Sequence, residues 1–127
     1  MANPKHILIV DDIETNRHLM KELLGVFDCR LSFAEDGKQA VLSVAEDRPD
    51  LILMDIAMPV MDGIAATREL RTRWDSDTLP IIIVTAYQED DYEREARQAG
   101  CNDFLTKPVD MGRLVSVVAE VVNAPTA

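Results

Sequence analysis

The chain has 127 residues, 47% hydrophobic and 28% charged, a balance that fits one globular domain and leaves no room for a second of ordinary size. Its formal net charge of −10 disfavours direct nucleic-acid binding, because phosphate backbones would be repelled, and favours a cation or a basic protein surface as partner. No stretch reaches the roughly 20 apolar residues that cross a bilayer, and the first residues carry no signal-peptide pattern, so we expect a cytoplasmic protein without a membrane segment.

Short apolar runs alternate with helical patterns along the chain. In chain order, the runs that we predict as strands are 7–10, 29–33, 51–54, 81–84 and 104–105. All but the weaker second run are apolar without a break, and continuous apolar runs are typical of central strands in a parallel sheet with both faces covered.

Helical periodicity fills the segments between these runs. In chain order, the predicted helices are marked by Met20, Leu23, Leu24 and Phe27; by Val41, Val44 and Ala45; by Ala66, Leu70 and Trp74; by residues 90–99 with Gly100 as the stop; and by residues 110–123 with the buried stripe Leu114, Val117, Val118 and Val121. Five strands alternating with five helices predict a doubly wound α/β sheet with right-handed crossovers. In such a sheet the site forms outside the carboxyl ends of the strands, where the strand order reverses.

Functional groups follow four of the five runs. Asp11 and Asp12 follow the first run, Asp55 the third, Thr85 the fourth and Lys107 the fifth. Adjacent strands lie about 4.8 Å apart, so carboxylates at neighbouring strand ends can share one cation. A divalent cation and the Lys107 ammonium would also relieve the repulsion between three carboxylates. Because the ligands are all oxygens, without His or Cys, we predict Mg²⁺, with Mn²⁺ as a substitute.

The segments ILIVDD, PDLILMDIAMPVMDG, IIIVTAY and GCNDFLTKP resemble the receiver domain of two-component response regulators, the single-domain chemotaxis and cell-cycle receivers included. The resemblance spans residues 5–123, so we expect residues 1–127 to form a single receiver domain with its core at 5–123. It implies a flavodoxin-like fold, with five parallel strands in the order 2-1-3-4-5 flanked by five helices. It also implies a cis peptide bond between Lys107 and Pro108.

The same resemblance implies a role for each residue of the predicted site. Asp55 would accept a phosphoryl group. Asp12, Asp55 and the backbone carbonyl of Ala57 would bind Mg²⁺ directly, and Asp11 would hold the metal through water. The remaining phosphoryl-binding and switch positions are Thr85, Ala86, Lys107 and Phe104.

Two features depart from many family members. Phosphorylation is expected to draw Thr85 and the Ala86 amide toward the phosphate and to let the aromatic residue at position 104 turn inward. Phe104 stands where many family members have Tyr, and it has no hydroxyl to form a hydrogen bond outward in the inactive form. We therefore expect a less polarised switch. The alternative is that Phe104 is a plain core aromatic residue without a switch role. Ala57 and Tyr87 border the path of the hydrolytic water, and we expect them to give a long-lived acyl phosphate unless they are ordinary loop residues.

The implied function is signalling and not enzymatic turnover, apart from self-phosphorylation and slow autodephosphorylation. The phosphoryl donor would be a phosphohistidine on a histidine kinase or a histidine phosphotransfer protein. A downstream protein would bind the face formed by the fourth helix, the fifth strand and the last helix, where Met111, Val115 and Val122 lie outside the core stripe. The alternative is that these three residues only broaden the buried face of the last helix. The chain ends at Ala127, so we expect output through protein contacts or competition for phosphate, from a monomer or a phosphorylation-dependent dimer.

Three other interpretations stay open at this point. The same module could come from a hybrid histidine kinase, whose receivers the segment MPVMDGIAATRELR resembles. A haloacid-dehalogenase-type phosphatase also attacks with an aspartate beside Mg²⁺, but it needs a second acid at the position of Ala57. A flavodoxin-like flavin protein needs a Ser/Thr-rich phosphate loop, whereas residues 11–16, DDIETN, would repel phosphate.

Overall fold

The computed structural model describes residues 4–122, which form a parallel sheet between two layers of helices. The strands are β1 Lys5–Val10, β2 Cys29–Ala34, β3 Leu51–Met54, β4 Ile81–Thr85 and β5 Asp103–Thr106. The helices are α1 Glu14–Leu23, α2 Gly37–Glu46, α3 Gly63–Arg71, α4 Asp90–Ala99 and α5 Met111–Val122, with a 3₁₀ turn at Leu24–Val26 after α1. The strand order is β2-β1-β3-β4-β5 with every pair parallel, which confirms the predicted doubly wound fold.

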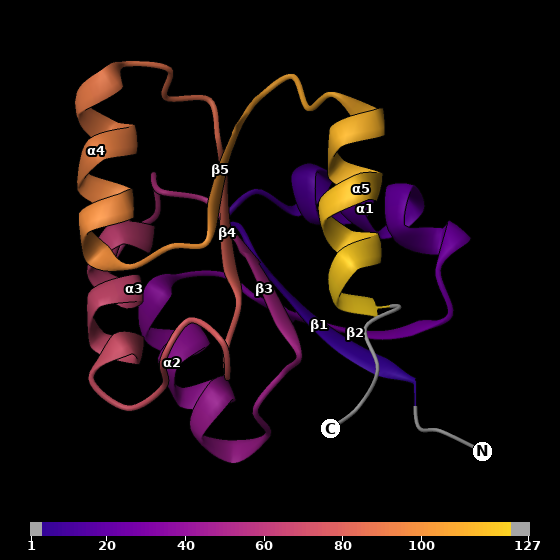
Figure 1. Ribbon diagram of the computed structural model, residues 1–127, viewed down its shortest axis with the longest axis horizontal. Helices are drawn as coiled ribbons and strands as arrows, with labels where there is room; N and C mark the ends of the chain where they lie inside the picture. Colours follow the sequence, from indigo (N-terminus) through magenta and orange to yellow (C-terminus); the bar gives the residue numbers. More distant parts are fainter. Residues whose placement is uncertain (1–3, 123–127) are drawn as a thin grey trace.

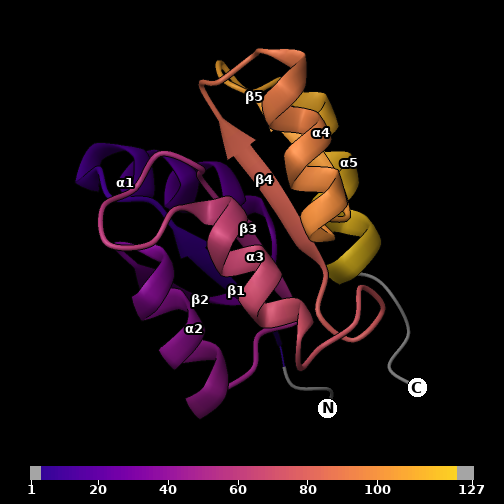
Figure 2. The same cartoon turned by 90° about the vertical axis from the view of Figure 1, so that its left-hand side faces the viewer.

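The two helical layers cover opposite faces of the sheet. Figure 1 shows α2, α3 and α4 on one side and α1 and α5 on the other, and Figure 2 shows the first layer from the front. One apolar cluster joins Leu8, Val10, Ile52, Met54, Ile81 and Ile83 to α2, α3 and α4, and the other joins Ile7, Ile9, Leu51, Leu53, Ile82 and Val84 to α1 and α5. Successive strand residues therefore enter different clusters, which explains why the central runs are apolar at every position.

Helix ends follow local chemistry that the sequence carries. The Asp36 carboxylate caps α2 by accepting from the Gln39 amide, and the Asp62 carboxylate caps α3 by accepting from the Ala65 amide, each at 2.8 Å. Gly100 ends α4 with a φ of 109°, a left-handed conformation that glycine adopts without a Cβ penalty. This confirms the predicted stop at Gly100.

Some predicted boundaries were wrong by a few residues. The first helix was expected to reach Phe27, but α1 ends at Leu23 and a 3₁₀ turn follows. Trp74 lies three residues beyond the end of α3, and its amide donates to the Leu70 carbonyl at 2.9 Å. The predicted last residue of the final helix, Asn123, lies outside the described residues.

The peptide bond between Lys107 and Pro108 is cis, as expected. No helix of the described part of the chain has both the length and the apolar character that crossing a membrane would require.

Candidate functional site

The strand ends bring three charged side chains together at one edge of the sheet. The Lys107 Nζ, one residue after β5, lies 3.0 Å from Asp11 Oδ2 and 3.0 Å from Asp55 Oδ2. Asp11 and Asp55 directly follow the paired strands β1 and β3, and the Asp55 amide donates to the Val10 carbonyl at 3.0 Å. Asp55 and Asp11 precede Lys107 by 52 and 96 positions in the sequence. The three residues meet because the parallel topology brings the ends of their strands to the same edge.

The two carboxylates of this group are buried, with Asp11 6% and Asp55 8% exposed. Their other oxygens are also held, because Asp11 Oδ1 accepts from the Ile13 amide at 2.9 Å and Asp55 Oδ1 accepts from the Ile56 amide at 2.7 Å. Burial alone would lower the pKa of Lys107, but its hydrogen bonds and charge interactions with both aspartates outweigh burial and raise that pKa. Lys107 therefore stays charged, and two carboxylates sharing one ammonium leave an excess negative charge.

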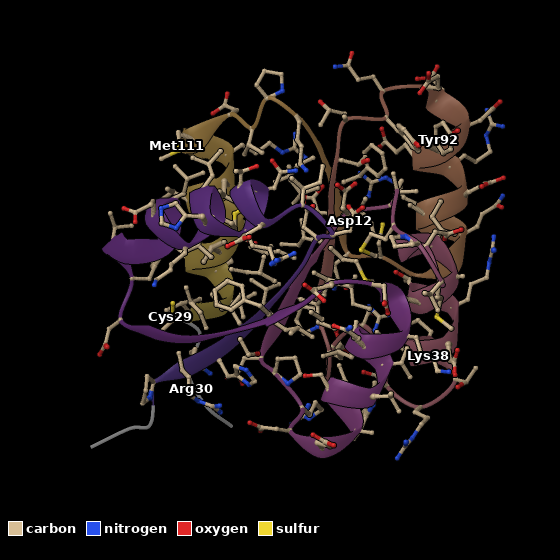
Figure 3. The ribbon with its side chains drawn as sticks, turned by 180° about the vertical axis from the view of Figure 1, so that it is seen from behind. Asp12, Cys29, Arg30, Lys38, Tyr92 and Met111 are labelled. Carbon is tan, nitrogen blue, oxygen red and sulfur yellow. The ribbon has the colours of Figure 1, made fainter. Side chains whose placement is uncertain are left out.

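Asp12 and Ala57 lie at the same edge but are exposed. Figure 3 labels Asp12 just beyond the end of β1. Within residues 4–122, no three Asp, Glu, His or Cys side chains are grouped closely enough to hold a metal ion. The structure thus brings Asp11 and Asp55 together as predicted, whereas the tight cluster of three carboxylates is not formed. The Asp12 side chain is exposed, whereas that of Asp11 is buried.

The oxygen donors at this edge suit Mg²⁺. Mg²⁺ binds through one or two carboxylates and keeps several water ligands, so it does not need a closed carboxylate cage. Asp55 is buried, whereas Asp12 and Ala57 at the same edge of the sheet are exposed, and these oxygen donors match such an open arrangement. The residues present therefore fit a hard divalent cation.

The predicted switch residues occupy the ends of β4 and β5. Thr85 is fully buried, and its Oγ1 accepts from the Tyr87 amide at 3.2 Å. Ala86 and Tyr87 follow on an exposed loop, where the Tyr87 ring lies 4.6 Å from the ring of Tyr92 in α4. Phe104 is 7% exposed and packs in the core cluster on the α4 side, so its ring already lies inward in this structure. Its expected movement on phosphorylation stays a prediction.

Sequence reasoning missed two residues that shape this edge. A Cβ at Gly63 would lie 2.0 Å from the Asp55 carbonyl oxygen, so α3 can begin this close to Asp55 only with glycine. Arg17 Nη1 donates to the Asp11 carbonyl oxygen at 2.7 Å. The Asp-Gly pair at 62–63 is a turn signal that could have indicated Gly63. Hydrophobic periodicity carries no signal for the contact that Arg17 makes.

An apolar cavity of about 330 Å³ lies next to the charged group. It is lined by Leu19, Met20 and Leu23 of α1 and by Met111 at the start of α5, which Figure 3 labels. Its other walls include Asp11, Asp55 and Lys107. The charged group therefore borders a largely apolar hollow.

A parallel sheet of order 2-1-3-4-5 with two buried aspartates and a lysine at its reversal edge defines a flavodoxin-like signalling fold. The chain belongs to the response regulator receiver domain family, whose model matches residues 7–119. It is therefore a receiver domain of two-component signalling, and the phosphatase and flavin-protein interpretations are set aside.

Relatives support this assignment at the level of sequence. Protein PilH of Pseudomonas aeruginosa is 35% identical over 115 residues, which cover 91% of this chain and 95% of PilH. Response regulator PleD of Caulobacter vibrioides is 38% identical over 104 residues, which cover 82% of this chain. The match covers only 23% of PleD, so the chain spans about a quarter of that relative's length.

Solved structures of receiver domains support the same assignment. The receiver domain of the sensor histidine kinase PA1611 from Pseudomonas aeruginosa, with a magnesium ion coordinated in its active site cleft, has a TM-score of 0.85 and 34% identity, and the match covers 96% of this chain and 100% of that one. The co-crystal structure of the Saccharomyces cerevisiae histidine phosphotransfer protein Ypd1 with the receiver domain of Ssk1 gives a TM-score of 0.82 and 30% identity, over 97% of this chain and 92% of that one.

Proposed function

We propose that this receiver accepts a phosphoryl group on Asp55 from a phosphohistidine of a histidine kinase or a histidine phosphotransfer protein. The observation that carries the proposal is the 3.0 Å contact between Lys107 Nζ and Asp55 Oδ2. A carboxylate oxygen of Asp55 attacks phosphorus in line, the bond to the histidine nitrogen breaks, and an acyl phosphate forms. The ammonium of Lys107 stabilises the charge that spreads over the phosphoryl oxygens.

Mg²⁺ is the proposed cofactor, held by Asp12, Asp55 and the Ala57 carbonyl directly and by Asp11 through water, with Mn²⁺ as a substitute. When bound, the cation would neutralise charge on the phosphoryl oxygens. The excess of negative charge around Lys107 supports a cation here, and the magnesium ion in the PA1611 receiver gives a precedent in a related domain.

The switch is proposed to start at Thr85. Its hydroxyl oxygen accepts from the Tyr87 amide at 3.2 Å, and turning that hydroxyl toward a phosphoryl group would break this bond. The loop through Ala86 and Tyr87 leads into α4, so movement of this loop would change the face formed by α4, β5 and α5. Phe104 packs beneath α4, and a change in its ring position would carry the same signal to that face.

Slow autodephosphorylation is part of the proposal. Ala57 has no polar side chain to orient water, and the Tyr87 ring, two residues after Thr85, packs against the Tyr92 ring with centroids 4.6 Å apart. We expect the acyl phosphate to outlast those of fast chemotaxis receivers, and Ala57→Asn to shorten its lifetime. Decay of the phosphorylated protein, followed by mass spectrometry, checks this; loss of the wild-type label within seconds would refute it.

The remaining expectations concern the context in which the module acts. We propose that residues 1–127 act as one receiver with its core at 5–123, in the cytoplasm, as a monomer or a phosphorylation-dependent dimer. Its partners would be a phosphohistidine donor, as in the Ypd1–Ssk1 pair, and a downstream protein at the α4–β5–α5 face. The exposed Met111 at the start of α5 and the charged outer surface of α4 support an interaction surface there.

The decisive experiment is phosphorylation by a small acyl-phosphate donor with Mg²⁺. We expect the wild type to gain one phosphoryl group, Asp55→Asn to gain none, and Asp28→Asn, which changes an exposed carboxylate after α1, to behave as the wild type. Equal labelling of the Asp55→Asn variant would reject Asp55 as the acceptor.

A further inference from the structure

The second turn of α1 sends a charged side chain back over the functional edge of the sheet. Arg17 Nη1 donates a 2.7 Å hydrogen bond to the carbonyl oxygen of Asp11, and Arg17 Nη2 lies 3.6 Å from Glu35 Oε1 in the loop after β2. Only 15% of the Arg17 side chain is exposed. Taking a guanidinium out of water is costly unless partners hold it, so its two partners indicate a specific task.

The carbonyl that Arg17 holds belongs to the peptide that joins Asp11 to Asp12. Fixing the plane of this peptide sets the direction in which the Asp12 side chain leaves the backbone. Arg17 therefore acts on two of the site's carboxylates at once, although it touches neither carboxylate in the structure.

The same turn has few other supports. Ile13, the N-cap residue of α1, has no side-chain hydrogen bond to offer the first turn of the helix. Asp11 Oδ1 takes part of that role by accepting from the Ile13 amide at 2.9 Å and from the Asn16 side-chain amide at 3.4 Å. The Arg17 bond to the Asp11 carbonyl closes the turn from its other side.

We infer that Arg17 is a positioning residue of the phosphoacceptor site: it holds the Asp11–Asp12 turn in the shape that presents Asp12 to a divalent cation, and Glu35 holds the guanidinium in place. The ligand in this inference rests on the proposed function. Arg17 does not touch the cation and acts only through the turn.

Charge and positioning predict opposite effects when Arg17 is removed. The guanidinium is a positive charge beside a cation site, so on charge alone its loss should tighten Mg²⁺ binding. If Arg17 positions Asp12, its loss should weaken Mg²⁺ binding, because a mobile carboxylate must be ordered at each binding event. The direction of the change therefore separates the two roles.

The test is calorimetric titration of Mg²⁺ into the unphosphorylated wild type and four variants, with circular dichroism to verify folding. We expect Arg17→Met to raise the dissociation constant about tenfold, as removal of a group supporting metal ligands typically does. Arg17→Lys keeps the charge but not the planar fork, and we expect a smaller loss. Glu35→Gln changes an exposed residue and should also weaken Mg²⁺ binding slightly. This variant tests the inference even if Arg17→Met does not fold.

Arg30→Met is the matched control, because Arg30 also pairs with a carboxylate, Asp47. Figure 3 labels Arg30 toward the opposite end of the sheet from Asp12, and its loss should leave Mg²⁺ binding unchanged. In the metal-free protein, amide hydrogen exchange at Ile13 should be faster in Arg17→Met than in the wild type.

Each outcome decides a different question. Unchanged or tighter Mg²⁺ binding by folded Arg17→Met, or unaltered exchange at Ile13, would overturn the positioning role. Failure of the wild type itself to bind Mg²⁺ would instead overturn the metal part of the proposed function, and the presentation of Asp12 to a cation with it.

Discussion

Among single residues, Lys107 balances the charge of the site, because its one ammonium is shared by two buried carboxylates. Removing it as Lys107→Met would leave Asp11 and Asp55 close together without compensation, and we expect a loss of roughly 3 kcal/mol in the free energy of unfolding. Saturating Mg²⁺ should reduce this loss, because the cation replaces part of the missing positive charge. Urea unfolding with and without Mg²⁺ measures both effects; an equal loss in the two conditions would contradict a shared charge site.

His6 shows a different kind of residue effect, in β1 and away from the carboxyl strand ends. The residue is 4% exposed, its Nε2 lies 2.7 Å from Ser32 Oγ, and its Nδ1 has no hydrogen-bond partner in the described part of the chain. Burial first, and then the charge of Arg30, lower the pKa of His6 against the opposing pull of Asp47 and Asp50.

The direction of this shift predicts how stability depends on pH. The ordinary pKa of 6.5 applies to the unfolded chain and the lower value to the folded protein, so the unfolded chain binds more protons in between. The protein should therefore lose stability as the pH falls from about 6.5 toward the lower folded-state pKa. We expect His6→Gln to flatten this slope in urea unfolding, whereas His18→Gln, at an exposed site on α1, should keep it. The same slope in all three proteins would exclude His6 as its source.

Among the elements, the start of α3 lies directly against the backbone that follows β3 at the site. The Gly63 amide donates to the Ile56 carbonyl at 3.0 Å, and a Cβ on Gly63 would lie 2.0 Å from the Asp55 carbonyl oxygen. We expect Gly63→Ala to cost about 3 kcal/mol in the free energy of unfolding, because α3 or the strand end must move. Gly25→Ala is the control, since a Cβ there has no neighbour within 4 Å. Chemical denaturation compares the two; similar stabilities would show that the backbone yields easily.

Element boundaries were predictable where two independent signals agree. The run 51–54 and the helix 90–99 were predicted at the residues where β3 and α4 lie, because apolar or helical patterns end there at a charge or at Gly100. The end of α1 was missed. The stripe through Leu24 and Phe27 reports which residues face the core, but it does not distinguish an α-helical hydrogen bond from a 3₁₀ one.

Some residues of the candidate site could likewise be predicted from the sequence, and others could not. Asp11, Asp55 and Lys107 were predictable because strand order alone brings their positions to one edge. The exposure of Asp12 and the buried position of the Phe104 ring were not, because both depend on the tertiary packing around each side chain. Arg17 was missed for the same reason: its bond to a backbone carbonyl depends on how the helix leaves the strand.

For the whole molecule, binding of the proposed cation would be linked to folding stability, because the site is assembled only when distant strand ends meet. A ligand that binds the folded state alone raises the free energy of unfolding by about 2.7 kcal/mol at one hundred times its dissociation constant. We therefore expect Mg²⁺ to raise the thermal midpoint of the wild type clearly, and that of Asp12→Asn much less.

General charge screening must be separated from this effect, since the chain carries a net charge of −10 and any salt weakens its self-repulsion. Sodium chloride at matched ionic strength should stabilise the wild type, Asp12→Asn and Asp28→Asn to similar extents, whereas Mg²⁺ should favour the wild type and Asp28→Asn over Asp12→Asn. If Mg²⁺ stabilised all three equally, its effect would be screening, and Asp12 would have no direct part in holding the cation.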